Sequence, residues 1–239
     1  MKFMNLDSPF MRFLGKMADL MILNLLVITC SIPIITMGAS LTAMHYVALK
    51  IVRNEESYIT KDFFKSFRMN FKQATLMWLF VLVVGVLIGY DIFIMTSTSI
   101  NIPGVIKVII LVVTAILALT TSFVFPLLSK FDNTNINIFK NSFAISIAKF
   151  PRAIVMVVVS LAPIAILFMP KYFPFLVLFG FSVPAWISAL LYNEVFKRLE
   201  EIVYEAEREA NPEAFAVNSE DDDVCIFKDL PLEDEGEQQ

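Results

Sequence analysis

The sequence predicts an all-α integral membrane protein, a polytopic bundle of transmembrane helices followed by an acidic tail. Hydrophobic residues make up 57% of the 239 residues and charged residues 18%, against about 45–50% and about 25% in soluble domains. The mean hydropathy is +0.71. Residues 1–198 hold 17 Lys and Arg against 8 Asp and Glu, whereas residues 199–239 hold 2 against 15. We therefore expect a basic membrane part and an acidic tail.

An apolar stretch at residues 17–52 is too long to cross a membrane once. As a helix it would measure about 54 Å, against a hydrocarbon core about 30 Å thick. Pro33 and Gly38 interrupt it near the middle, so we expect a hairpin of two spans, 17–34 and 39–52. The second span is short and must stand upright, thin the bilayer or be re-entrant against protein. The alternative is a single crossing that leaves the N-terminus outside.

Four further apolar segments follow, joined alternately by short loops and by long basic loops. The segments lie at residues 74–96, 105–128, 153–169 and 175–192. The positive-inside rule places loops rich in Lys and Arg in the cytoplasm. The basic loops, residues 53–73 and 129–152, are separated by two spans and should both be cytoplasmic. A single crossing at residues 17–52 would then put the basic N-terminus outside, against the same rule, whereas a hairpin keeps it inside. We therefore expect five long spans and a short sixth, with both termini cytoplasmic.

The segment TKDFFKSFRMNFKQ at residues 60–73 has the pattern of an amphipathic helix. Its four phenylalanines fall within an arc of about 100° on a helical wheel, and its four cations within an arc of about 60°. One interpretation is a helix in the membrane surface, with the cations near anionic headgroups. The other is a connecting helix packed on the bundle. The candidate headgroup contacts are Lys61, Lys65, Arg68 and Lys72.

Beyond the last span, apolar residues keep helical spacing while charged residues fill the other face. We expect the span to continue as a cytoplasmic helix through residues 193–210. Asn211 and Pro212 end it, because proline lacks the backbone N–H that a helix needs. The remaining residues are acidic and poor in aromatics, as disordered segments are. The sequence thus divides into a membrane domain, 1–210, and a tail, 211–239.

Polar residues at membrane depth are candidates for function, because burying them unpaired costs several kcal/mol. Asn24 lies in mid-span, where an amide commonly bonds a neighbouring helix. His45 has no second metal ligand nearby, so helix packing is favoured over a proton relay. Asp91 follows Gly85 and Gly89 near the end of its span, where an interfacial position is favoured over an outward cavity. For Asn24 too, a structural role is favoured over ligand binding.

Prolines within or near the spans break backbone hydrogen bonds and predict kinks. Broken helices can form binding sites in transporters, so Pro33 and Gly38 are also candidates, as hinges. The prolines are Pro33, Pro126, Pro163 and Pro184.

The sequence offers no motif of an enzyme. It has no Walker A loop, HExxH, GxSxG, paired-cysteine motif or cluster of carboxylates, which are the patterns that organise nucleotide, metal and nucleophile chemistry. We expect no catalytic residue, no cofactor and no metal. The expected partners are the lipid bilayer and another membrane protein, with oligomers left open and nucleic acid excluded.

The run LNLLVITCSIPIITMGASLTAMHYVALKIVRNEE, with DFFKSFRMNFKQATLMW after it, resembles the YesL-like family of uncharacterised bacterial membrane proteins. The shared features are the Leu-Asn-Leu-Leu start, a proline and a Thr-x-Gly-Ala turn, a short helix ending in Lys and Arg, and the Phe/Lys segment. They cover residues 5–78. The resemblance implies a multi-pass protein of the bacterial plasma membrane and adds no catalytic residues.

Members of that family often lie beside genes for sugar uptake of the ATP-binding-cassette type. The resemblance therefore implies an accessory or regulatory component associated with carbohydrate uptake. The alternative is a small transporter or channel in its own right, built from the proline-broken spans.

Overall fold

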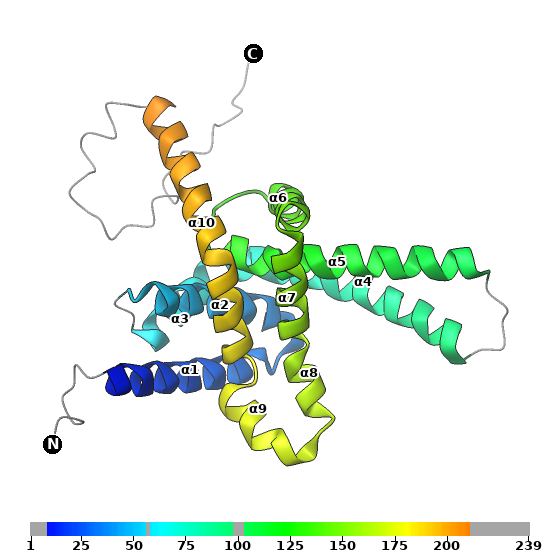
Figure 1. The fold of residues 1–239 in the computed structure, drawn as a ribbon, viewed down its shortest axis with the longest axis horizontal. Helices are drawn as coiled ribbons and strands as arrows, with labels where there is room; N and C mark the ends of the chain where they lie inside the picture. Colours follow the sequence, from blue (N-terminus) through cyan, green and yellow to red (C-terminus); the bar gives the residue numbers. More distant parts are fainter. Residues whose placement is uncertain (1–8, 56–57, 98–102, 211–239) are drawn as a thin grey trace. The chain divides into compact units, whose positions relative to one another are not determined.

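The computed structural model describes residues 9–55, 58–97 and 103–210, and every regular element in them is a helix (Figure 1). The all-α prediction is therefore confirmed for the described part of the chain. Two compact units divide the chain, residues 1–193 and residues 194–239. The predicted tail, 211–239, lies outside the described residues.

The first apolar stretch folds as two helices joined by a short 3-10 turn. The elements are α1 (Pro9–Ser31), η1 (Ile34–Thr36) and α2 (Met37–Arg53). The Ser40 hydroxyl in α2 donates a hydrogen bond to the Val27 carbonyl of α1, at 3.2 Å, so the chain doubles back as a hairpin. Helix α1 begins earlier than residue 17, and α2 extends the expected limb of 39–52 at both ends. With η1, the second limb is 20 residues long, Ile34–Arg53.

The connecting segment and the next hairpin follow, as α3 (Ile59–Met69), α4 (Phe71–Ser97) and α5 (Gly104–Lys130). Helices α4 and α5 pack against each other (Figure 1). The predicted continuous helix over residues 60–73 is wrong at its end, because the chain bends at Asn70. Phe71 and Lys72 therefore belong to α4 and not to the amphipathic helix. The loop residues 98–102 lie outside the described part.

The remaining elements are shorter and are separated by breaks. They are α6 (Asn135–Ala148), α7 (Phe150–Ser160), α8 (Ala162–Leu167), η2 (Pro170–Tyr172), α9 (Phe173–Phe179) and α10 (Ser182–Ala210). The segment predicted as one span at 153–169 has a turn at Leu161, but Phe150–Leu167 still qualifies as one span. The segment predicted at 175–192 is not a single helix, because α9 and α10 meet at a bend of 56°.

Proline explains these breaks. Each of α7, α8, η2 and α9 has a proline at its first or second position, and Pro184 lies in the first turn of α10. The first turn tolerates proline because its N–H groups have no partner within the helix. A proline further along would remove a helical hydrogen bond, so each helix starts anew at its proline.

Within the described residues, five helical segments have the length and hydropathy of membrane spans. They are Phe10–Ser31, Ile34–Arg53, Phe71–Ile94, Gly104–Lys130 and Phe150–Leu167, and the bent pair Pro170–Phe179 with Ser182–Ala206 makes a sixth if it is one span. These helices are typical of a multi-pass membrane protein. The predicted short limb is thus long enough, while the predicted last span is the broken one.

Helix α2 forms the centre of the first unit, packed against α1, α3, α4 and α5. Its small residues allow this close packing. A Cβ atom added to Gly38 would clash with the Ala74 carbonyl oxygen and the Trp78 Cβ of α4. Only glycine lets the two backbones come so near, so Gly38 serves helix packing and is not part of the turn.

Candidate functional site

Asn24 is a predicted site residue whose side chain joins distant parts of the chain. Its side chain is fully buried. The Nδ2 group donates hydrogen bonds to the carbonyls of Leu176, at 3.0 Å, and Val177, at 2.7 Å. The Oδ1 atom accepts hydrogen bonds from the backbone N–H groups of Phe181, at 2.8 Å, and Ser182, at 3.1 Å. An amide has two donors and two acceptor sites, so Asn24 is saturated.

All four partners of Asn24 flank the break between α9 and α10. A helix end leaves its last carbonyls and first N–H groups without partners. Water would satisfy them in a soluble protein, but the interior of a membrane offers none. Asn24 therefore supplies from α1 hydrogen bonds to the Val177 carbonyl and to the N–H groups of Phe181 and Ser182, and adds a second bond to the Leu176 carbonyl. We call Asn24 with these four backbone groups the Asn24 clamp.

The break itself depends on Gly180 as well as on Pro184. The Gly180 N–H donates to the Leu176 carbonyl at 2.9 Å. A Cβ atom at position 180 would lie 2.6 Å from that carbonyl oxygen, so a larger residue would push the two apart. Pro184 has no N–H for the carbonyl of residue 180, four positions earlier. Together the two residues favour a bend over a continuous helix.

The turn of the first hairpin is held by side chains on both sides. The Thr36 hydroxyl lies 2.6 Å from the Cys30 carbonyl oxygen and 2.8 Å from that of Pro33, and it can donate to either. The Trp78 indole of α4 donates to the Ile34 carbonyl at 2.8 Å. Pro33 precedes η1 at φ −74°, a value its ring allows. Of the two hinge candidates, Pro33 is at the turn and Gly38 is not.

His45 contacts Tyr192, a fully buried residue at the other end of the first unit's sequence. The Tyr192 hydroxyl donates to the His45 carbonyl at 3.2 Å and lies 3.4 Å from the ring Nδ1 atom. The two rings meet edge to face, with centroids 5.9 Å apart. This arrangement supports a packing role for His45. Among the described residues, no three His, Cys, Asp or Glu side chains come together as metal ligands would.

The end of α2 carries polar contacts that the sequence analysis missed. Arg53 Nε donates to Asn193 Oδ1 at 2.9 Å. Lys50 Nζ lies 3.3 Å from Asp62 Oδ2 of α3, and 5.4 Å from the centroid of the Tyr46 ring. The Arg53 contact joins residues 140 positions apart. No local pattern could have identified that pair.

The other candidates lie apart from these contacts. Asp91 is exposed on α4, as is each of the four predicted headgroup cations on α3 and α4. Gly85 and Gly89 have no atom within 4 Å of where a Cβ would be, so their spacing is not used for packing within the described chain. No hydrogen bond or ion pair joins Asn24, His45 and Asp91 to one another in that part of the chain. They therefore form no common site.

Comparison with known protein families gives a match over part of the chain. Neither a curated protein nor a solved structure matches the chain. Residues 20–92 match the model of a family described as a protein of unknown function, DUF624. That stretch runs from α1 to the second half of α4, so it includes Asn24, the turn, Gly38 and the bend at Asn70. Over these helices the chain is similar to the DUF624 family of proteins of unknown function.

Proposed function

We propose that this protein is an accessory or regulatory membrane component that acts by contacting another membrane protein. The Asn24 clamp carries the proposal. A transport site needs polar groups free to bind a solute, whereas the amide at the centre of α1 uses every donor and acceptor within the chain. The polar atoms of the Asn24 side chain in α1 are thus used to hold the fold together.

The outer surface supports a role in protein contact. Only 6% of the α4 span and 22% of the α5 span are buried within the protein. Large apolar side chains such as Val86 and Leu111 point outward, 63% and 72% exposed. In a bilayer such a surface meets lipid or the spans of another protein. The pair of α4 and α5 is therefore the surface that we assign to a partner.

We further propose that the chain is a YesL-like protein of the bacterial plasma membrane, and that its partner is a sugar transporter of the ATP-binding-cassette type. The YesL-like resemblance over residues 5–78 is the reason, and YesL belongs to the family that residues 20–92 match. The basic loops favour cytoplasmic termini. Reporter fusions after Ile35, Ser99, Tyr172 and Gln239 test that topology, with the fusions after Ile35, Ser99 and Tyr172 expected outside and the last inside.

Affinity purification from native membranes tests the partner. The transporter's membrane subunits should co-purify with the tagged chain, and deletion of the gene should lower sugar uptake. If no transporter subunit co-purifies and uptake is unchanged, the proposal fails.

The bend between α9 and α10 favours a second candidate, a small transporter, because transporters often bind solutes at discontinuous spans. Purified protein in proteoliposomes decides between the two. The accessory role predicts no solute flux. A flux that is lost in Asn24→Leu or His45→Leu protein, with the fold intact, would support the transporter instead.

A further inference from the structure

The bend between α3 and α4 is a fixed corner in the chain. Asn70 is 8% exposed. Its Nδ2 group bonds the Ser66 carbonyl at 3.2 Å and the Ser66 hydroxyl at 3.3 Å. Its carbonyl accepts the Ala74 N–H at 2.8 Å, in the first turn of α4. The Asn70 side chain thus bonds the end of α3, while its backbone carbonyl bonds the first turn of α4.

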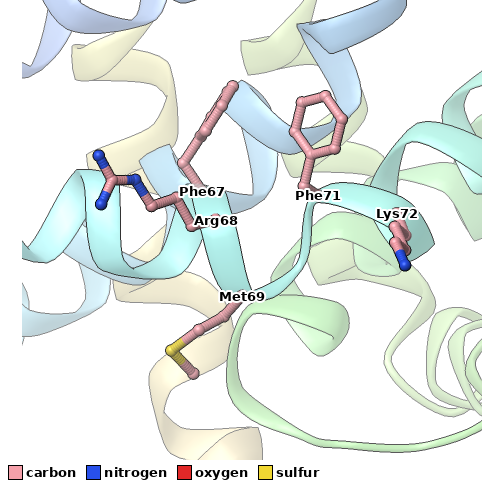
Figure 2. Close-up of a pocket in the computed structure, with 5 residues that line it drawn as sticks. All are labelled: Phe67, Arg68, Met69, Phe71 and Lys72. Carbon is pink, nitrogen blue, oxygen red and sulfur yellow. The ribbon is translucent and has the colours of Figure 1, made fainter.

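A hollow of about 430 Å³ lies at the corner, lined by Phe67, Arg68, Met69, Phe71 and Lys72. Figure 2 shows the rings of Phe67 and Phe71 on the same side of the ribbon, with Arg68 at one flank and Lys72 at the other. The two ring centroids are 5.5 Å apart. An apolar surface with a cation at each flank suits a ligand that is part apolar and part anionic.

The corner carries positive charge that a ligand can reach. The four cations Lys61, Lys65, Arg68 and Lys72 are exposed, and none of them forms an ion pair with another described residue. Asp62 is the only acidic residue of α3, and its carboxylate is already 3.3 Å from Lys50 Nζ. Acidic side chains on α3 therefore do not neutralise the cations.

The corner lies at the end of a membrane span. The apolar segment of α4 begins at Phe71, so the adjoining residues fall at the level where lipid headgroups meet water. Aromatic side chains concentrate at that level. Arginine binds phosphate through two parallel hydrogen bonds, and lysine binds it as a point charge. These positions favour a lipid over a soluble acidic peptide.

We propose that the α3–α4 corner binds the headgroup of an anionic phospholipid, with Arg68 and Lys72 contacting the phosphate and the Phe67 and Phe71 rings contacting the apolar part. The proposed site differs from a single helix in the membrane surface by the bend at Asn70. It places a cation from each of two helices around one hollow.

Native mass spectrometry of the full-length protein in neutral detergent tests the proposal. Phosphatidylglycerol and phosphatidylcholine with the same acyl chains are titrated into wild-type and Arg68→Gln/Lys72→Gln protein. The wild type should prefer phosphatidylglycerol, and the variant should lose roughly tenfold or more of that preference, since a cation near a membrane surface contributes about fivefold. Both residues are exposed, so the fold, checked by circular dichroism and thermal stability, should be unchanged.

The matched control is Lys140→Gln/Lys197→Gln, which removes two exposed cations elsewhere and changes the net charge equally. It should keep the preference for phosphatidylglycerol. An equal loss in both double variants would mean general charge attraction and would overturn the proposal. Displacement of the lipid by inorganic phosphate alone would assign the corner to free phosphate instead, and no preference in the wild type would also refute a lipid site.

Discussion

Helices α2 and α4 both have the length and apolar composition of membrane spans, yet they meet opposite surroundings. Within the protein 56% of the α2 span is buried, against 6% of the α4 span. The buried helix is rich in small residues, and the exposed helix is rich in large ones. The fully buried small residues of α2 include Ala39, Ser40, Ala43 and Ala48, and the mostly exposed large ones of α4 include Val83, Val86 and Leu87.

The more apolar helix of the two is the one on the outside. In water, apolar residues collect inside a protein because burial removes them from the solvent. In a bilayer the lipid is as apolar as leucine, so burial depends on how closely two backbones can pack. Gly38 allows α2 to reach α4 where no Cβ would fit. Small residues, and not hydropathy, therefore mark the interior of this protein.

The largest effect is expected inside the bundle, at Asn24. Asn24→Leu leaves the N–H groups of Phe181 and Ser182 and the Val177 carbonyl without their partner. The expected loss of stability is about 4 kcal/mol, from roughly 1–2 kcal/mol for each group. Thermal unfolding of the purified protein in detergent measures it.

Thr114→Val is the control for Asn24→Leu. It removes a span hydroxyl that bonds only its own helix, at the Ile110 carbonyl 2.7 Å away, and the expected change is below about 0.5 kcal/mol. Equal stability of the two variants would mean that the clamp does not hold the fold.

A pair of glycine substitutions tests the two sides of the comparison directly. Gly38→Ala forces α2 away from Ala74 and Trp78 and should cost about 2–3 kcal/mol. Gly85→Ala on α4 meets no atom within 4 Å and should be neutral or stabilising by up to about 1 kcal/mol, because alanine favours helix. The midpoint temperatures of the two variants should move in opposite directions, and a parallel shift would contradict the close approach at Gly38.

A pair of valines gives the same test with side chains of one size. Val47 of α2 is fully buried, and Val86 of α4 is 63% exposed. Val47→Ala should cost about 1–2 kcal/mol because it leaves a cavity, whereas Val86→Ala should change stability by less than about 0.5 kcal/mol. Denaturation curves of both variants in the same detergent provide the measurement. If Val86→Ala costs as much, α4 is packed against something that the single chain lacks, such as a partner.

The smallest effect concerns the point where α4 touches the first hairpin. Trp78→Phe removes the hydrogen bond to the Ile34 carbonyl and should cost about 1 kcal/mol. Trp186→Phe is its control, since the buried Trp186 indole nitrogen has no hydrogen-bond partner in the described chain. Removing that donor should be less costly or even stabilising. A greater loss for Trp186→Phe would reverse the assignment, and thermal shifts of the two variants decide it.

Local patterns predicted where the chain turns better than where helices continue. Stretch length and loop charge indicated a hairpin near Pro33, and the structure turns there. Pro163 and Pro184 were expected to kink spans. A helix break precedes each of them, with a bend of 56° between α9 and α10, whereas Pro126 lies inside α5 without ending it. No local pattern predicted the bend at Asn70. The side chain of Asn70 bonds Ser66, one turn earlier in α3, a local contact that asparagine can make with its own backbone.

For the candidate site, too, local patterns predicted one part and not the other. An asparagine in mid-span predicts a partner on another helix, since an unpaired amide in lipid is costly. The backbone groups that bond Asn24 are 152 to 158 positions away in the sequence. No local pattern could therefore identify the α9–α10 break as the partner.

The sequence by itself determined that this protein is helical, which segments have the length and hydropathy of spans, and that its one mid-span asparagine needs a partner. These properties follow from composition, periodicity and the cost of an unpaired polar group, which act along the chain. Only the tertiary structure decided that α2 lies inside and α4 outside, and that Asn24 holds a broken helix. Close backbone approach and hydrogen bonds between distant residues depend on how the helices pack. Lipid is as apolar as the side chains, so hydropathy alone does not select which apolar face is buried.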